Sequence, residues 1–316
     1  MKYSPLHKCR LRAGMTQAEL ADAMAVGQSD YQKWESGTAK IPTGKINKLA
    51  KLLNATKEDI LGLPKRFDLM GIDESIGDEN KYYGEVAFHF ESKDSSLLLP
   101  ISQAECDRLH GLLQLDVFYV TVESLDNRRV FIRRSALKDV FFSSEAYDDF
   151  GPESHKNQLG IFPDDEFWDV VENLEYLEGF SDEHRPSRFE EAVLSQIRLT
   201  EAQIDELIKS GNIEEGDREK VRNEATEITE NFLARARNIV WQFSSGQARS
   251  VYCVEDDLIN EVFSSLERTE DKTIHFPVEG YHRSIYINAD AIDFISVPTH
   301  KFHAGELENI EKDLDN

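Results

Sequence analysis

The polar side chains best placed for specific contacts cluster between Thr16 and Gly37, in the segment TQAELADAMAVGQSDYQKWESG. A helix over residues 28–36 would put Tyr31 and Trp34, three positions apart, on its inner side. Its outer and leading face then carries hydrogen-bonding and charged groups, from Gln28, Ser29, Asp30, Gln32 and Lys33. The segment predicts two short helices joined by a tight turn, the second shaped to lie in the major groove of DNA.

Motifs for catalysis or metal binding do not stand out elsewhere in the sequence. It contains no HExxH, paired CxxC, Walker loop or GxGxxG pattern. His300 and His303 have a loose metal spacing, and a surface or structural role is the expected one. The cysteines are odd in number and widely spaced, which fits a reducing cytoplasm without a disulfide framework: Cys9, Cys106 and Cys253. We expect no enzymatic activity, no metal and no cofactor, although catalytic residues far apart in sequence leave no local signature.

Start and stop signals define the helices that position these groups. Ser4 and Pro5 suit a helix start, and Thr16 with Glu19 forms a capping box. Five helices are expected in residues 1–66: Pro5 to Ala13, one opened by Thr16, Gln28 to Ser36, Thr43 to Leu53, and a short one capped by Thr56.

This head, residues 1–66, resembles the lambda-repressor/Cro-like helix-turn-helix family, often called XRE-type. The matching residues are LRAGMTQAELADAM, the turn, YQKWESG, IP and LAKLLN. Two positions depart from the family pattern. Ala25 stands where the turn usually has glycine, and Gly27 replaces a small polar cap, so a slightly altered helix crossing is expected.

The resemblance implies DNA contacts for nine residues: Thr16, Gln17, Gln28, Ser29, Asp30, Gln32, Lys33, Lys40 and Lys45. Gln28 and Ser29 begin the recognition helix and Gln32 follows one turn later, so these side chains would reach base edges. Gln17 resembles a position that holds phosphate and supports the reader helix. Asp30 either accepts from cytosine or caps the helix. The three lysines either contact the DNA backbone or are solvated surface charges.

Charge separates the head from the rest of the chain. Residues 1–66 carry 12 Lys and Arg against 6 Asp and Glu, whereas the remaining 250 residues carry 24 against 54. Phosphates would repel this acidic body, so it should face away from a duplex; ordinary solubilising charge is the alternative explanation. Such heads usually bind as two-fold dimers on half-sites about 10 bp apart. We therefore expect the body to supply dimerisation.

An internal repeat at an offset of 155 is the most informative feature of the body. Residues 117–141, VFYVTVESLDNRRVFIRRSALKDVF, align with residues 272–296, KTIHFPVEGYHRSIYINADAIDFIS. Each copy follows two strand-like segments and an amphipathic helix, at Ala104 to Leu115 or Asp256 to Leu266. The repeat predicts a duplicated module of two strands, a helix and three short strands, with alternating residues typical of sheets with one buried face. Chance similarity between β-rich segments is the alternative.

The fold class expected is multidomain α+β, divided into six segments. They are the head 1–66, a linker 67–80, a first α+β module 81–150, a helical insert 151–240, a second module 241–304 and an acidic, disordered tail 305–316. Helices in the insert are expected at Pro163 to Glu178, Ser187 to Leu199, Thr200 to Ser210 and Asp217 to Phe243. The last is either a dimer arm or a spine between the modules.

The main hypothesis is a sequence-specific transcriptional regulator that binds double-stranded DNA. It would act as a repressor and homodimer on a two-fold operator, with a body that dimerises and takes a small-molecule effector or protein partner. An antitoxin-like protein, whose acidic body masks a basic partner, is the alternative, and an enzyme with a DNA-targeting head is a third. No apolar run approaches the ~18–20 residues of a membrane span, and the N-terminal stretch lacks the apolar core of a secretory signal.

Overall fold

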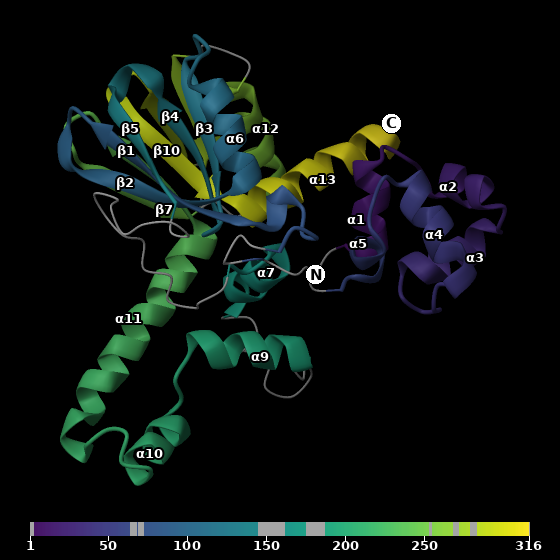
Figure 1. Ribbon diagram of the computed structural model, residues 1–316, viewed down its shortest axis with the longest axis horizontal. Helices are drawn as coiled ribbons and strands as arrows, with labels where there is room; N and C mark the ends of the chain where they lie inside the picture. The colour runs from purple at the N-terminus through teal and green to yellow at the C-terminus, as the bar shows by residue number, and fades with distance from the viewer. Residues whose placement is uncertain are drawn as a thin grey trace.

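The protein consists of a helical head followed by an α+β body, as the sequence predicted (Figure 1). The structure is a computed structural model that describes residues 3–63, 68, 73–144, 162–174, 187–252, 255–267, 272–278 and 283–315. The head contains α1 (Pro5–Arg12), α2 (Gln17–Met24), α3 (Gln28–Glu35), α4 (Thr43–Leu52) and α5 (Lys57–Leu61).

Local signals in the head act as expected. The Ser4 and Thr16 side chains cap α1 and α2, and Glu19 completes the capping box at Thr16. Ala25 ends α2 in the left-handed conformation with φ 54°, a conformation that costs a residue with a Cβ some strain. Tyr31 is fully buried with Leu20 and Met24, which confirms it as a core residue.

The body is built on three sheets whose strand orders are β2-β1-β5, β3-β4-β10-β6-β7 and β8-β9. The first four strands are β1 (Tyr82–Phe90), β2 (Lys93–Ser102), β3 (Tyr119–Ser124) and β4 (Arg128–Arg133). The others are β5 (Leu137–Ser143), β6 (Asn238–Phe243), β7 (Ala248–Tyr252), β8 (Thr273–Pro277), β9 (Ser284–Asn288) and β10 (Ile292–Pro298). All the ladders between these strands are antiparallel.

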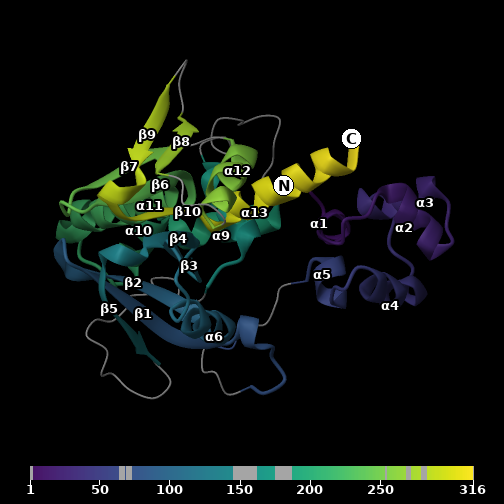
Figure 2. The same cartoon turned by 90° about the horizontal axis from the view of Figure 1, so that it is seen from above.

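The five-stranded sheet is the middle layer of the body (Figure 2). One face packs against β1, β2, β5 and α6 (Gln103–Leu112), and the other against β8, β9 and α12 (Asp256–Leu266). Val120 and Val130 lie in the first of these cores, and Phe131 and Ile295 in the second. The prediction of one buried face is therefore wrong for β3, because the middle layer is covered on both sides.

The element order supports the internal repeat. The series strand, strand, α-helix, strand, strand, 3-10 turn, strand occurs as β1 to β5 and again as β6 to β10. The 3-10 turns, η2 (Arg134–Ala136) and η4 (Ala289–Ala291), stand 155 residues apart, as do the first residues of β5 and β10. The two copies are not separate units, however, because β4 of the first pairs with β10 of the second.

The insert forms a helical arm beside the sheets (Figure 1). Its helices are α7 (Asp165–Glu172), α9 (Arg188–Ile197), α10 (Glu201–Lys209) and α11 (Arg218–Arg237), with the 3-10 turn η3 (Glu215–Asp217) before α11. The prediction that the long helix continues to Phe243 is wrong, because residues 238–243 form β6 between β10 and β7. The end of the helix predicted at Pro163 to Glu178 lies outside the described residues beyond Leu174.

The predicted disordered tail is instead the second half of a helix, α13 (Thr299–Asp315). Leu307 of this helix packs against Tyr3 and Leu11 of the head. The acidic composition of the segment gave no indication of this buried contact, which orders the helix. Gly305 lets α13 lie against α12, since a Cβ at that position would meet Asp256 O at 1.9 Å. Within the predicted linker, the structure places the 3-10 turn η1 (Asp78–Asn80) directly before β1.

Three further features concern chemistry. Cys9 and Cys106 are buried thiols that take part in no disulfide, and Cys253 lies outside the described residues. Among the residues that the structure describes, no group of three or more His, Cys, Asp and Glu side chains is arranged to hold a metal ion. In the same part of the chain, no helix is long and apolar enough to cross a membrane.

Candidate nucleic-acid interface

The outer face of α3 presents the side chains expected to read DNA. They are exposed to solvent, namely Gln28, Ser29, Asp30, Gln32 and Lys33. The helix lies on the side of the head that faces away from the acidic body, while α1 and α5 face the body (Figures 1 and 2). An approaching duplex would therefore meet α3 without first meeting the sheets.

A buried ion pair fixes α3 to α1. Arg10 donates from Nε to Glu35 Oε2 at 3.0 Å and from Nη2 to Glu35 Oε1 at 2.9 Å, and its Nη1 donates to Met15 O at 2.7 Å. The two side chains are 6% and 4% exposed. Burial alone would raise the pKa of Glu35, but hydrogen bonds, first among them that from Arg10, hold this pKa below its usual value. Glu35 is therefore an ionised, acceptor-only group on the buried side of α3.

This carboxylate orients two glutamines in series. Because Glu35 only accepts, Gln17 turns its amide nitrogen toward Glu35 Oε1, at 3.2 Å. The Gln17 amide oxygen then faces outward and accepts from Gln32 Nε2 at 3.0 Å. Gln32 is thus held with its amide oxygen and one N–H available at the outer face. The predicted supporting role of Gln17 gains a physical basis, since it connects the buried ion pair to Gln32, a residue predicted to read bases.

Sequence reasoning missed Arg10 and Glu35. Glu35 lies one turn after Tyr31, on the buried side of α3, and Tyr31 had already been assigned inward. A carboxylate at that spacing needs a cation, and Arg10 was the available partner. The position of Glu35 one turn after Tyr31 could therefore have indicated a buried ion pair.

The remaining predicted residues have mixed outcomes. Lys40 is exposed, and Lys33 pairs with Asp30 at 3.3 Å. Asp30 does not cap α3, whose N-cap is Gly27 without a side-chain bond. Lys45 donates to Met24 O at 3.1 Å, so in this structure it holds the carboxyl end of α2. Thr16 serves as the cap of α2.

The head is joined to the body through α13. Tyr3 donates its hydroxyl to Glu311 at 2.7 Å, and His7 Nε2 lies 3.2 Å from the other oxygen of the same carboxylate. His7 Nδ1 lies 3.4 Å from Glu35 Oε1. His7 therefore stands between the body helix and the carboxylate that orients the recognition face.

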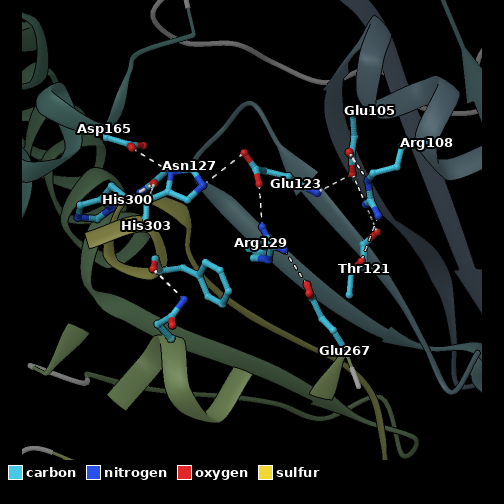
Figure 3. A network of polar contacts seen from close by, with 12 residues as sticks. Glu105, Arg108, Thr121, Glu123, Asn127, Arg129, Asp165, Glu267, His300 and His303 are labelled. Carbon is cyan, nitrogen blue, oxygen red and sulfur yellow. Dashed lines mark hydrogen bonds and ion pairs between the residues drawn. The ribbon is translucent and has the colours of Figure 1, made fainter. Parts of the chain in front are cut away.

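At its other end, α13 is anchored in the body by a polar network (Figure 3). Glu123 on β3 accepts from Arg129 at 2.8 Å and lies 3.6 Å from His303 Nε2. His303 Nδ1 lies 2.9 Å from Asp165, and His300 contacts Asn127 at 3.1 Å. The structural role predicted for the two histidines of α13 fits these contacts.

The stability of the protein is expected to fall as the pH rises from 7 to 10. Burial lowers the pKa of His303, but Asp165 and Glu123 outweigh this effect and raise the pKa to about 10. An unfolded histidine has a pKa of about 6.5, so the stabilisation is complete below that pH and is lost as the pH passes through the folded value. Denaturant unfolding should show a loss of about 3–4 kcal/mol over this range. His303→Gln should flatten that slope; an unchanged slope would contradict the assignment.

Comparison with known proteins agrees with the geometry of the head. Residues 6–61 match the family model described as Helix-turn-helix. Residues 6–61 are a helix-turn-helix domain. The match confirms the resemblance of the head to the XRE-type family, and such a domain supports a DNA-binding function of the transcription-regulator type. No family model matches the body, and no curated protein and no solved structure matches the chain.

Proposed function

We propose that the protein is a sequence-specific transcriptional repressor that binds a two-fold operator as a homodimer. The observation that carries this proposal is the outer face of α3, where Gln28 and Ser29 are exposed and the Gln32 amide is held in one orientation. A fixed amide can discriminate between bases, because it presents a donor and an acceptor at set positions. Repression follows most simply, since a bound dimer blocks polymerase without a further contact.

The placement of charge supports the same direction of approach. The head has a surplus of positive side chains and the rest of the chain a larger surplus of negative ones. With α3 on the far side of the head, the repulsion between phosphates and body is weakest when α3 faces the duplex (Figure 1). One head offers few phosphate contacts, so two heads in one dimer would give useful affinity.

We place effector binding and dimerisation in the body. A cavity of about 490 Å³, a volume typical of small-molecule sites, is walled by the aromatic side chains of Phe162, Phe167, Trp168 and Phe189. Thr299 and His303 of α13 also line it. Because α13 continues from this wall to Glu311 at the head, a ligand there has a direct path to the recognition domain. We propose a binding role, and no catalytic one, for this cavity.

Gln28→Ala tests the reader-helix assignment. A duplex recovered from a randomised pool by the full-length protein serves as the reference site. The variant should lose about 1–3 kcal/mol of binding free energy and relax the preference at one base position in each half-site. Fluorescence anisotropy on single-base variants of the duplex measures both effects.

Lys40→Ala is the matched control, because Lys40 is also exposed in the head but carries a charge suited to phosphate. It should weaken all duplexes alike and lower the dependence of binding on salt. An unchanged base preference in Gln28→Ala would overturn the assignment, and a base-specific loss in Lys40→Ala would contradict the division of roles.

A further inference from the structure

The two copies of the internal repeat differ in one strand pairing. In the first copy, the hairpin β3-β4 leaves its own module, and β4 pairs along β10 of the second copy. In the repeat, β9 corresponds to β4 and β5 corresponds to β10. The equivalent pairing for the second hairpin would therefore join β9 to β5. Within the described residues, β9 pairs only with β8 and β5 pairs only with β1. One of two equivalent ladders is therefore formed and the other is not.

The equivalence of these strands is well defined. β4 ends at Arg133 and β9 at Asn288, and β5 and β10 each run for seven residues. Each of these bounds is shifted by the offset of 155 found in the sequence. The register of β4 on β10 can therefore be transferred to β9 on β5 without a gap.

The two open edges cannot meet within one chain as it stands. β5 belongs to the layer on one side of the five-stranded sheet, and β9 belongs to the layer on the other side (Figure 2). Each edge also exposes a large aromatic side chain: Phe141 on β5 is 41% exposed and Tyr286 on β9 is 70% exposed. Phe131, the β4 counterpart of Tyr286, is fully buried. Tyr286 therefore lies on a face of β9 that is open to solvent, whereas the matching face of β4 is covered by α12.

We propose that β9 of one chain pairs antiparallel with β5 of a second copy of the chain. The register follows that of β4 on β10, in which Phe131 faces Ile295 and Val130 faces Ser296. The transferred ladder pairs Tyr286 with Val140 and Ile285 with Phe141. This inference rests on the homodimer proposed above and names its interface. Because each chain carries both edges, a two-fold dimer can form the ladder twice and leave neither edge open.

The side chains complement one another in this register. Residues directly opposite in an antiparallel pair lie on the same face of the sheet. Exposed Phe141 would therefore lie beside Ile285, which packs on the partner's core with Ile287. Exposed Tyr286 would lie beside Val140, which packs on the other core with Phe142. Each exposed aromatic extends a hydrophobic core of the other chain, as Phe131 does within one chain.

Charge substitution at the edges gives the first test. Tyr286→Lys and Phe141→Lys alter exposed positions, so the chain should still fold, and each should raise the dimer dissociation constant at least about tenfold, because every two-fold dimer contains the change twice. Leu115→Lys, at 56% exposure but on neither edge, is the matched control and should leave the constant unchanged. Ile228→Lys tests the alternative in which the dimer forms through the exposed surface of the long helix α11. Sedimentation velocity on the full chain measures all four.

Disulfide trapping gives the second test, specific to the register. A chain carrying Val140→Cys is mixed with a tagged chain carrying Tyr286→Cys, and Phe141→Cys with Ile285→Cys, under mild oxidation. Adjacent pairs alternate between close and wide spacing, so at least one mixture should yield a covalent heterodimer. The mixture of Phe141→Cys with Tyr286→Cys is one residue out of register and should not, nor should the unaltered chain through its native thiols.

The outcomes separate this inference from the proposed function. A dimer that binds DNA but resists trapping in both registered mixtures, or that dissociates only in Ile228→Lys, overturns the β9–β5 ladder and leaves the repressor proposal standing. A monomer at all concentrations and in the presence of operator DNA overturns both the ladder and the homodimer. A trapped dimer without sequence-specific DNA binding supports the ladder and contradicts the repressor.

Discussion

Replacement of Glu35 by alanine is expected to destabilise the head by about 3–5 kcal/mol, because it leaves the Arg10 guanidinium buried without a counter-charge. The same change removes the acceptor that orients Gln17 and, through it, Gln32. Specific DNA binding should therefore weaken together with stability. Amide hydrogen exchange in α1 and α3 measures the local loss, and it does so without assuming that head and body unfold together.

A double variant separates the two effects. Arg10→Met with Glu35→Met replaces the whole ion pair by apolar side chains of similar length, which should return most of the lost stability. It cannot orient Gln17, so base discrimination at the Gln32 position should stay relaxed. If the double variant recovered full discrimination, the relay from Glu35 to Gln32 would be wrong. If Glu35→Ala cost less than about 1 kcal/mol, the buried ion pair would not be the main link between α1 and α3.

Lys301→Met should lower the free energy of unfolding of the body by a similar amount. Lys301 is 1% exposed and its Nζ lies 2.6 Å from both Glu172 Oε1 and Asp256 Oδ1. Burial lowers the pKa of this lysine, but the two carboxylates outweigh it and raise the pKa above its usual value, so the charged form is the native one. Its removal leaves two mostly buried carboxylates without their shared cation. We expect a loss of about 3–5 kcal/mol at pH 7 in denaturant unfolding.

The pH dependence of the stability of Lys301→Met and a control substitution at Lys312 make this test specific. Without Lys301 the two carboxylates should have raised pKa values in the folded protein, so the variant should regain part of its stability as the pH falls toward 5. Lys312→Met, on the same helix, removes an ion pair with Asp257 whose lysine is 57% exposed, and it should change stability little. Equal losses in the two variants would contradict a special role for Lys301.

The helix-turn-helix head could be predicted from sequence because its determinants are local. The capping box at Thr16, the turn at Ala25 and the inward position of Tyr31 all depend on neighbours a few residues away. The contact between Arg10 and Glu35 spans 25 residues and joins two helices, so helical periodicity alone did not reveal it. The contact of Lys45 with Met24 O also joins two helices, and the capping alternative for Asp30 is wrong because Gly27 is the N-cap of α3. The DNA contacts of both residues stay predictions.

In the body, the internal repeat predicted the order of elements but not the pairing of the strands. The offset of 155 gave the element order of both modules correctly at η2 and η4. It did not reveal that β4 pairs with β10, which joins the predicted first and second modules in one sheet. The prediction of a disordered tail was wrong for a related reason. The segment has few apolar residues, Leu307, Ile310 and Leu314, and their burial depends on contacts with Tyr3 and Leu11, which are distant in sequence.

The most direct test of the central claim is selection of duplexes from a randomised pool by the full-length protein and by the Gln28→Ala, Gln32→Ala double variant. We expect the unaltered protein to enrich a two-fold motif with half-sites about 10 bp apart. The double variant should enrich a motif with relaxed positions in each half-site. Enrichment of no motif by the unaltered protein, or of an identical motif by both proteins, would contradict DNA recognition through the outer face of α3.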